Sequence, residues 1–424
     1  MRCASAGEGK WMNVYDRCFM ALLNAALRGE RAEIPEHFTA EVWDRVFCMA
    51  QTHHVLPLIY EAIYHIPDVQ GAAFMAMKRQ VRHQTALQAM KTYDFLLLNA
   101  QLRSRGMNPL VVKGIVCRNL YPFPDTRPSG DEDLLIPDQQ FVCFHEAMVS
   151  LGMTAVDEEA DPNGACEIAY RKKNSNLYIE AHQYLFSPES AAYGDLNRFF
   201  AGAFDRAVEE TIQGETVLTM SPTDHLFYLI CHSLKHFLHS GFGIRQVCDI
   251  ILYAEHYGAQ IDWKQILDNC REIRAEKFAA SVFRIGTVYL RFDATAAGYP
   301  DFWQKIHVNE EPMLEDLLDS GIYGGAELSR LHSSNITLTA AADQKRGAKG
   351  RGGVLSSIFP SVDFMKKRYP YLDKHPGLLP VAWASRMLQY GKETRKTNHN
   401  NAIRSIRIGH RRIALMKQYG ILED

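Results

Sequence analysis

Two aspartates, Asp131 and Asp133, stand two residues apart at the start of a short apolar run that ends at Ile136. In an extended strand such a pair shares one face, with Cα atoms only about 7 Å apart. If their oxygens approach to about 4 Å, the repulsion costs roughly 1 kcal/mol in water and about 4 kcal/mol at an effective dielectric of 20. A divalent cation removes that cost, and Mg²⁺ is commonly held by one or two carboxylates together with substrate phosphates. The spacing therefore indicates a metal site, although such a pair alone more often marks a polar strand entrance.

The segment before the aspartates predicts how they are positioned. Residues 109–112 form a short β-branched apolar run, which is typical of a buried strand. Lys113 and Gly114 end that strand, and residues 115–120 provide one or two helical turns. Residues 121–130 contain three prolines and are expected to be irregular. We therefore expect a strand, a Lys-Gly turn, a loop and then the aspartate strand.

A candidate third carboxylate lies further along the chain. Residues 167–172 and 177–186 are strand-like, and the intervening Asn-Ser-Asn predicts a hairpin turn. In the second strand Glu180 and His182 share one face. Glu180 is therefore a candidate partner for the aspartates, and the alternative is one more exposed residue of a hairpin.

These residues resemble a known family. The pattern is similar to that of the polymerase-β-type nucleotidyltransferases, in which a glycine turn precedes an Asp-x-Asp strand and a later strand supplies a third acid. It is most similar to a bacterial branch, the "uncharacterised nucleotidyltransferases", which has Lys-Gly in place of the usual Gly-Gly or Gly-Ser. The matching residues are Lys113, Gly114, Arg127, Ser129, Gly130, Asp131, Asp133, Leu134, Leu135 and Ile136.

The resemblance implies a Mg²⁺-dependent (or Mn²⁺-dependent) transfer of a nucleoside monophosphate from a nucleoside triphosphate, such as ATP, to a hydroxyl acceptor, with release of pyrophosphate. It implies a catalytic, metal-binding set made of Asp131, Asp133 and Glu180. His182 would contact the acceptor, act as a base or neighbour the metal. The nucleotide-binding residues would be Lys113, Gly114, Arg127, Ser129 and Gly130. For Arg127, an ordinary loop arginine is an equally good interpretation.

A strong helix signal follows the predicted sheet. Ser221 is a suitable N-cap, Pro222 suits the first helical position, and Gly241 suits the end of the helix. Four histidines along it recur at spacings of seven, four and three residues, which predicts a single stripe: His225, His232, His236 and His239.

A histidine stripe raises the alternative of a metal-dependent hydrolase, because histidines at i and i+4 can share a zinc ion. Between His232 and His236, however, no glutamate stands as a general base, and Lys235 beside the stripe disfavours a bound cation. We expect these three side chains to line the far wall of the cleft and bind substrate phosphates or the acceptor. A purely structural role is expected for at least two of the four histidines.

A second helix is predicted over residues 244–257, with Arg245 and Asp249 paired at i and i+4. Arg245 is included among the candidate substrate-binding residues. A histidine-rich helix followed by an Arg…Asp helix is also similar to the helical domain of the same branch. A catalytically inactive nucleotide-binding protein remains a further alternative.

Composition limits the partners and the compartment. The net charge is −2, so no strong positive field favours nucleic acid. A small hydroxylated acceptor is therefore favoured over nucleic acid, while a protein or RNA end stays open. Nine cysteines without a CxxC pair are expected to be reduced thiols. No apolar run has the length of a membrane span, and we expect a cytoplasmic protein.

The expected fold class is α+β and predominantly helical, with a small mixed-sheet nucleotidyltransferase domain between helical regions. The 424 residues allow several domains. The expected division is an N-terminal helical region (1–106), the α/β domain (107–220), a helical domain (221–340), a linker or loop (341–356) and a C-terminal helical region (357–424).

Overall fold

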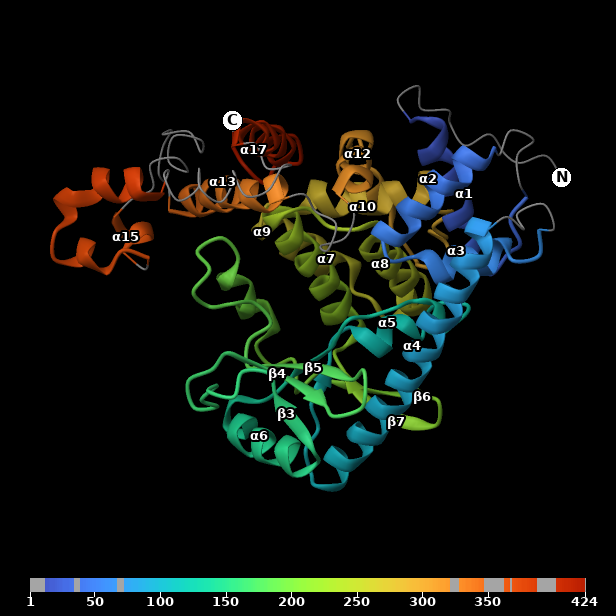
Figure 1. The fold of residues 1–424 in the computed structure, drawn as a ribbon, viewed down its shortest axis with the longest axis horizontal. Coiled ribbons are helices and arrows are strands. Elements are labelled where there is room, and N and C mark those ends of the chain that lie inside the picture. Colours follow the sequence, from blue (N-terminus) through green and yellow to red (C-terminus); the bar gives the residue numbers. More distant parts are fainter. Residues whose placement is uncertain are drawn as a thin grey trace.

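A computed structural model of the protein describes residues 12–33, 39–66, 72–320, 328–346, 362–366, 368–386 and 402–423. The described chain is predominantly helical, with one seven-stranded mixed sheet and helices at both ends (Figure 1). The predicted fold class is therefore confirmed.

Helices make up most of the described part of the first hundred residues. Helix α1 (Val14–Leu27) is capped by Asn13, and α2 (Ala40–Thr52) by Thr39. Helix α3 (Leu56–Ile63) packs on α1 and leads to the long helix α4 (Ala72–Ser104). Helix α4 descends along the sheet (Figure 1), where the Asn99 side chain donates to the Thr216 carbonyl oxygen at 2.8 Å.

The sheet places the aspartate strand at its centre. Its order is β3-β4-β5-β2-β1-β7-β6. Strand β2 runs antiparallel to β1 and parallel to β5, with Asp133 directly beside Glu180 in register. The strands are β1 (Leu110–Val111), β2 (Glu132–Leu135), β3 (Met153–Ala155), β4 (Glu167–Lys172), β5 (Tyr178–His182), β6 (Val208–Ile212) and β7 (Glu215–Thr219).

Two features of the sheet differ from the sequence analysis. Strand β5 ends at His182, so residues 183–186, which were expected to continue it, leave the sheet. The hairpin β6–β7 was not foreseen. Its turn residues Gln213 and Gly214 both have positive φ angles, 52° and 86°, as a two-residue turn between tightly paired strands requires.

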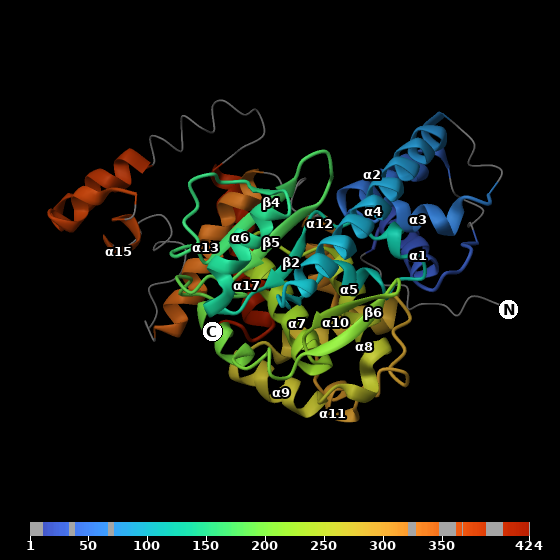
Figure 2. The same ribbon diagram turned by 90° about the horizontal axis from the view of Figure 1, so that it is seen from below.

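Helices cover both sides of the sheet. Figures 1 and 2 place α6 (Phe141–Ser150) on one side, and α7 (Pro222–His239) and α8 (Ile244–Tyr257) on the other. Helix α7 begins as predicted, because the Ser221 hydroxyl accepts from the Asp224 amide at 3.2 Å. Gly241 follows its end with φ of 109°. On the side of these helices away from the sheet lie α9 (Trp263–Glu272) and α10 (Glu276–Tyr289).

The C-terminal helices pack on the end of α7. Helix α13 (Leu328–Lys345) packs against both α7 and α17 (Ala402–Gln418). From α17 the Arg412 guanidinium donates to the carbonyl oxygens of Phe237 and His239, at the C-terminal end of α7. Further α-helices in the described residues are α5 (Gly114–Arg118), α11 (Asp301–Gln304), α12 (Glu311–Ser320) and α15 (Val362–Met365).

Helix α13 extends into the start of the predicted linker, and residues 347–356 of that linker lie outside the described residues. Among the helices that the structure describes, none is both long and apolar enough to cross a membrane.

Candidate active site

A cleft of about 580 Å³ lies between the sheet and helices α7 and α8. The structure brings every predicted site residue to this one cleft. Those lining it are Lys113, Gly114, Arg127, Ser129, Gly130, Asp131, Asp133, Glu180, His182, His232, Lys235, His236 and Arg245.

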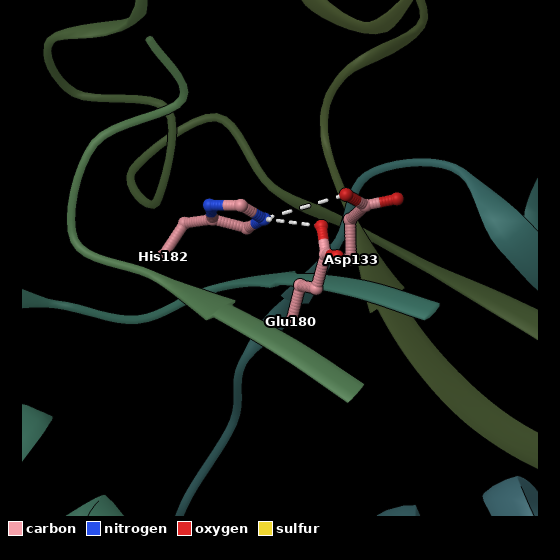
Figure 3. A group of neighbouring side chains, drawn as sticks. All are labelled: Asp133, Glu180 and His182. Carbon is pink, nitrogen blue, oxygen red and sulfur yellow. Dashed lines mark hydrogen bonds and ion pairs between the residues drawn. The ribbon is translucent and has the colours of Figure 1, made fainter. Parts of the chain in front are cut away.

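The acidic side of the cleft is built by two neighbouring strands. Because β2 and β5 are parallel and in register, Asp133 and Glu180 lie side by side. Together with His182, each offers a potential ligand atom within 4.8 Å of the others (Figure 3). Asp131 also lines the cleft, two residues before Asp133, but does not belong to this close group. Glu180, the candidate third carboxylate, thus lies beside the aspartate strand.

Crowding of negative charge perturbs this group. Burial, together with Asp131, Asp133 and Glu167, raises the pKa of Glu180 to about 7. Burial also acts to raise the pKa of Asp133, but the charges of Lys113 and His182 outweigh it and hold that pKa well below its usual range. Carboxylate oxygens gathered in this way are the donor set of a hard divalent cation, so the residues present fit such an ion.

His182 stands between three carboxylates. Its Nε2 atom lies 3.3 Å from Asp133 Oδ1 and 3.8 Å from Glu180 Oε2, while its Nδ1 atom lies 3.2 Å from Glu167 Oε2. Burial alone lowers the pKa of His182, but the hydrogen bonds to Asp133 and Glu167 raise it to about 9. Without a metal ion, the imidazole is therefore protonated at neutral pH and offsets part of the negative charge.

Glu167 is a site residue that the sequence analysis missed. It lies directly opposite His182 in the antiparallel β4–β5 pair and lines the cleft. The strands are joined by the four residues 173–176, because the Lys172 amide donates to the Leu177 carbonyl oxygen. The expected three-residue turn would have set Ile168 opposite His182, so it did not indicate Glu167.

The opposite wall is cationic or neutral. Lys113 Nζ lies 2.8 Å from Asp133 Oδ2 and 3.2 Å from His232 Nε2. His232 Nε2 is in turn 3.1 Å from His236 Nε2. Burial, followed by nearby lysine charge, depresses the pKa of both histidines well below its usual value. Burial also lowers the pKa of Lys235. The wall therefore presents lysine ammonium groups and neutral imidazoles.

A tight turn fixes Lys113 at the edge of the cleft. Helix α5 (Gly114–Arg118) begins immediately after β1, and Gly114 has a φ of 48°. The backbone amide of Ile115 donates to Glu132 Oε2 at 2.7 Å. A Cβ atom on Gly114 would lie only 1.8 Å from that same oxygen. Glycine is therefore required here both for the backbone conformation and for the close approach of Glu132.

Replacing this glycine tests the turn. We expect Gly114→Ala to lower the free energy of unfolding by about 2 kcal/mol or more, because it adds a positive-φ penalty to a clash with a buried carboxylate. Urea denaturation of both proteins measures the change. Gly130→Ala is the matched control, because a Cβ there meets nothing within 4 Å. An equal stability of the two variants would contradict this account of the turn.

Beneath the turn lies a buried network around Glu132, the residue between the two aspartates. Alternation along the strand puts Glu132 on the face opposite Asp131 and Asp133, and there its carboxylate is fully buried. Arg118 Nη2 donates to it at 2.9 Å, and Lys91 Nζ lies 3.9 Å away. The Ser129 hydroxyl accepts from Arg118 Nη1 at 2.8 Å, and the Ser129 amide donates to Gln88 at 2.9 Å. Ser129 thus lines the cleft, and its hydrogen bonds with the buried Arg118 and Gln88 fix its position.

The expected pairing of Arg245 with Asp249 is wrong. The Asp249 carboxylate accepts from Arg127 Nε at 2.7 Å, Arg127 Nη2 at 2.6 Å and the Tyr121 hydroxyl at 2.7 Å. Arg245 instead donates to the Pro128 carbonyl oxygen. A buried bidentate pair outweighs an i, i+4 pair on a helix, which contributes only about 0.2–0.5 kcal/mol. Arg127 is therefore no ordinary loop arginine, since it ties the loop before Asp131 to α8.

The predicted histidine stripe divides into two groups. His232 and His236 line the cleft, but His225 is buried against Thr219 and Tyr253. His239 hydrogen-bonds the Tyr193 hydroxyl at 3.0 Å. Among the residues that the structure describes, the close three-ligand group is the one around Asp133, and α7 forms none of its own. The geometry therefore does not favour a zinc hydrolase on this helix.

Comparison with known proteins gives one match. A family model described as an uncharacterised nucleotidyltransferase covers residues 39–290. The stretch runs from α2 through α10 and contains every cleft residue named above. No curated protein and no solved structure matches the chain.

Proposed function

The chain belongs to the uncharacterised nucleotidyltransferase family, and from this membership we propose that it transfers a nucleoside monophosphate from a nucleoside triphosphate to a hydroxyl acceptor. The observation that carries the proposal is the pairing of Asp133 with Glu180 across β2 and β5, facing Lys113 in one cleft. An acidic wall opposite a cationic wall is the polarity that a metal-bound triphosphate requires.

The acidic wall would hold Mg²⁺, or Mn²⁺ in its place. Asp131, Asp133 and Glu180 would be the ligands, because all three line the cleft and Asp133 and Glu180 are within reach of one ion. The ion, when bound, supplies charge neutralisation and polarises phosphate oxygens.

The protein's own residues bind and orient the nucleotide. Lys113, fixed by its turn, would contact phosphate oxygens beside Asp133, and Gly114 would let the backbone approach them. Lys235, His232 and His236 would hydrogen-bond the remaining phosphates. Arg127 Nη1 is buried at the cleft and has no hydrogen-bond partner among the described residues, so it remains a donor for ligand.

At phosphorus, one bond forms and one breaks. The acceptor oxygen attacks the α-phosphorus, and the proton of its hydroxyl group passes to solvent. The bond from the α-phosphorus to the bridging oxygen breaks, and pyrophosphate leaves with that electron pair. Because little covalent chemistry falls to the protein, positioning and charge account for most of the rate.

The cleft volume supports a small hydroxylated acceptor, since about 300–1,000 Å³ is the usual size of a small-molecule site. The near-neutral net charge of −2 agrees with this choice. A protein or RNA end would have to reach the α-phosphorus from the mouth of the cleft.

The test is nucleotide transfer itself. The purified chain is incubated with each α-labelled nucleoside triphosphate, Mg²⁺ and a panel of hydroxylated acceptors, including proteins and RNA. We expect incorporation of label that EDTA abolishes and added Mg²⁺ restores, because the acidic wall needs a counter-ion. Incorporation that survives the double variant Asp131→Asn/Asp133→Asn would reject the proposal. Calorimetry that shows nucleotide binding without product would favour an inactive binding protein instead.

A further inference from the structure

The close group of Asp133, Glu180 and His182 offers a nitrogen atom, from the imidazole, as well as carboxylate oxygens. His182 Nε2 lies 3.3 Å from Asp133 Oδ1 and 3.8 Å from Glu180 Oε2. Figure 3 shows the ring edge turned toward both carboxylates. The three side chains offer atoms within 4.8 Å of one another, so one ion between them would meet two oxygens and one nitrogen.

A second observation explains how the ring is held in that orientation. Glu167 sits opposite His182 in the β4–β5 register, and its Oε2 atom is 3.2 Å from Nδ1. A carboxylate on one ring nitrogen fixes the imidazole so that the other nitrogen is presented as a ligand, which is the usual support of a metal-bound histidine. The Glu167 side chain is 53% exposed, so it reaches His182 from the solvent side of the hairpin.

We propose that His182 Nε2 is a ligand in this site, that Glu167 is its positioning residue, and that the site therefore binds a first-row transition ion such as Mn²⁺ more tightly than Mg²⁺. Carboxylate, carbonyl and water oxygens suit both Mg²⁺ and Mn²⁺, but Mn²⁺, as a transition ion, also accepts imidazole nitrogen, which Mg²⁺ binds weakly. The inference rests on the proposed function only in taking this cleft as the metal site.

The competing role for His182 is that of a permanent cation. A protonated ring would offset the charge of Asp133 and Glu180 beside the metal without touching it. Lys113 already provides one positive charge to Asp133 at 2.8 Å. The two roles differ in one measurable property, which is whether a nitrogen is bonded to the ion.

Mn²⁺ is the probe, because its unpaired electrons report directly bonded nitrogen. The full-length chain is loaded with one equivalent of Mn²⁺ and examined by electron spin echo envelope modulation. We expect ¹⁴N modulation from a bound imidazole in the wild type and in His239→Gln, whose ring contacts Tyr193 away from the cleft. We expect that modulation to be lost in His182→Gln.

Affinity gives a second readout. Calorimetric titrations with Mn²⁺ and with Mg²⁺ should show tighter binding of Mn²⁺ by the wild type. Glu167→Gln should weaken Mn²⁺ binding by about tenfold or more, the usual effect of removing an orienting partner. The same variant should change Mg²⁺ binding less, because Mg²⁺ relies on the oxygens.

The outcomes separate this inference from the function on which it builds. Mn²⁺ that binds the wild type without ¹⁴N modulation overturns the nitrogen ligand and leaves nucleotidyl transfer standing. A wild type that binds neither Mn²⁺ nor Mg²⁺, with or without nucleoside triphosphate, overturns the metal-dependent function itself. Absence of ¹⁴N modulation in the wild-type spectrum is decisive even if His182→Gln fails to fold, and Glu167→Gln then provides the second variant.

Discussion

Asp133→Asn is expected to slow nucleotidyl transfer by on the order of 10²–10³-fold, the cost of removing one preorganised charge from a transition state. Asp133 contacts both the acidic and the cationic side chains of the cleft. It lies beside Glu180 in the sheet, 2.8 Å from Lys113 and 3.3 Å from His182. Its replacement removes a proposed metal ligand and also the ion-pair partner of Lys113. Turnover of α-labelled nucleotide under saturating Mg²⁺ measures the loss.

The variant should remain folded, because Lys113 borders the cleft, where water can solvate its ammonium group. Circular dichroism and a melting curve check this. Asp138→Asn, an exposed aspartate five residues later, is the matched control and should keep full activity. Asp133→Asn with more than a tenth of wild-type turnover would remove the acidic wall from the mechanism.

Glu132→Ala is expected to lower the free energy of unfolding by about 3–5 kcal/mol, the usual cost of removing one partner from a buried ion pair. Glu132 is fully buried, and so are the charges that it balances: Arg118 is 1% exposed and Lys91 is 3% exposed. The variant leaves both buried cations without their carboxylate partner and the Ile115 amide without its acceptor. Urea denaturation with a tryptophan fluorescence readout gives the difference.

Two comparisons make this result specific. Glu146→Ala, an exposed glutamate on α6, should change stability by no more than about 0.5 kcal/mol. Glu132→Gln keeps the shape and can still accept from Ile115, so it should be less destabilising than Glu132→Ala. A loss below about 1 kcal/mol for Glu132→Ala would mean that the two cations find other partners. Glu132, the middle residue of the Asp-x-Asp motif, would then contribute little to the stability of the fold.

Local signals in the sequence predicted the elements well. The start of α7 follows from Ser221 and Pro222, and the hairpin β4–β5 follows from two alternating runs around a turn. The position of Glu180 beside Asp133 was also foreseeable, because alternation along a strand and family resemblance agreed on it. The first two features depend on residues close together in the chain, whereas the position of Glu180 beside Asp133 joins two distant strands and rested on the resemblance.

Choices between distant partners were not predictable in the same way. Asp249 had Arg245 one helical turn away, but Arg127 reaches it from a loop more than one hundred residues earlier. Nothing local to Glu132 reveals that Lys91 of α4 and Arg118 of α5 will surround it. His225 belongs to the histidine spacing but faces Thr219 and Tyr253. In each case the partner depends on the tertiary packing of distant segments, which local sequence patterns do not specify.

The Arg412 contact bears on how this protein can be dissected. The family match ends at residue 290, yet the last carbonyl groups of α7 are bound by an arginine more than one hundred residues beyond it. Excision of the matched stretch would strip those carbonyls of their donor, one helical turn from His236. Helix α17 therefore stabilises the end of α7, which lines the cleft, and is not a detachable appendage.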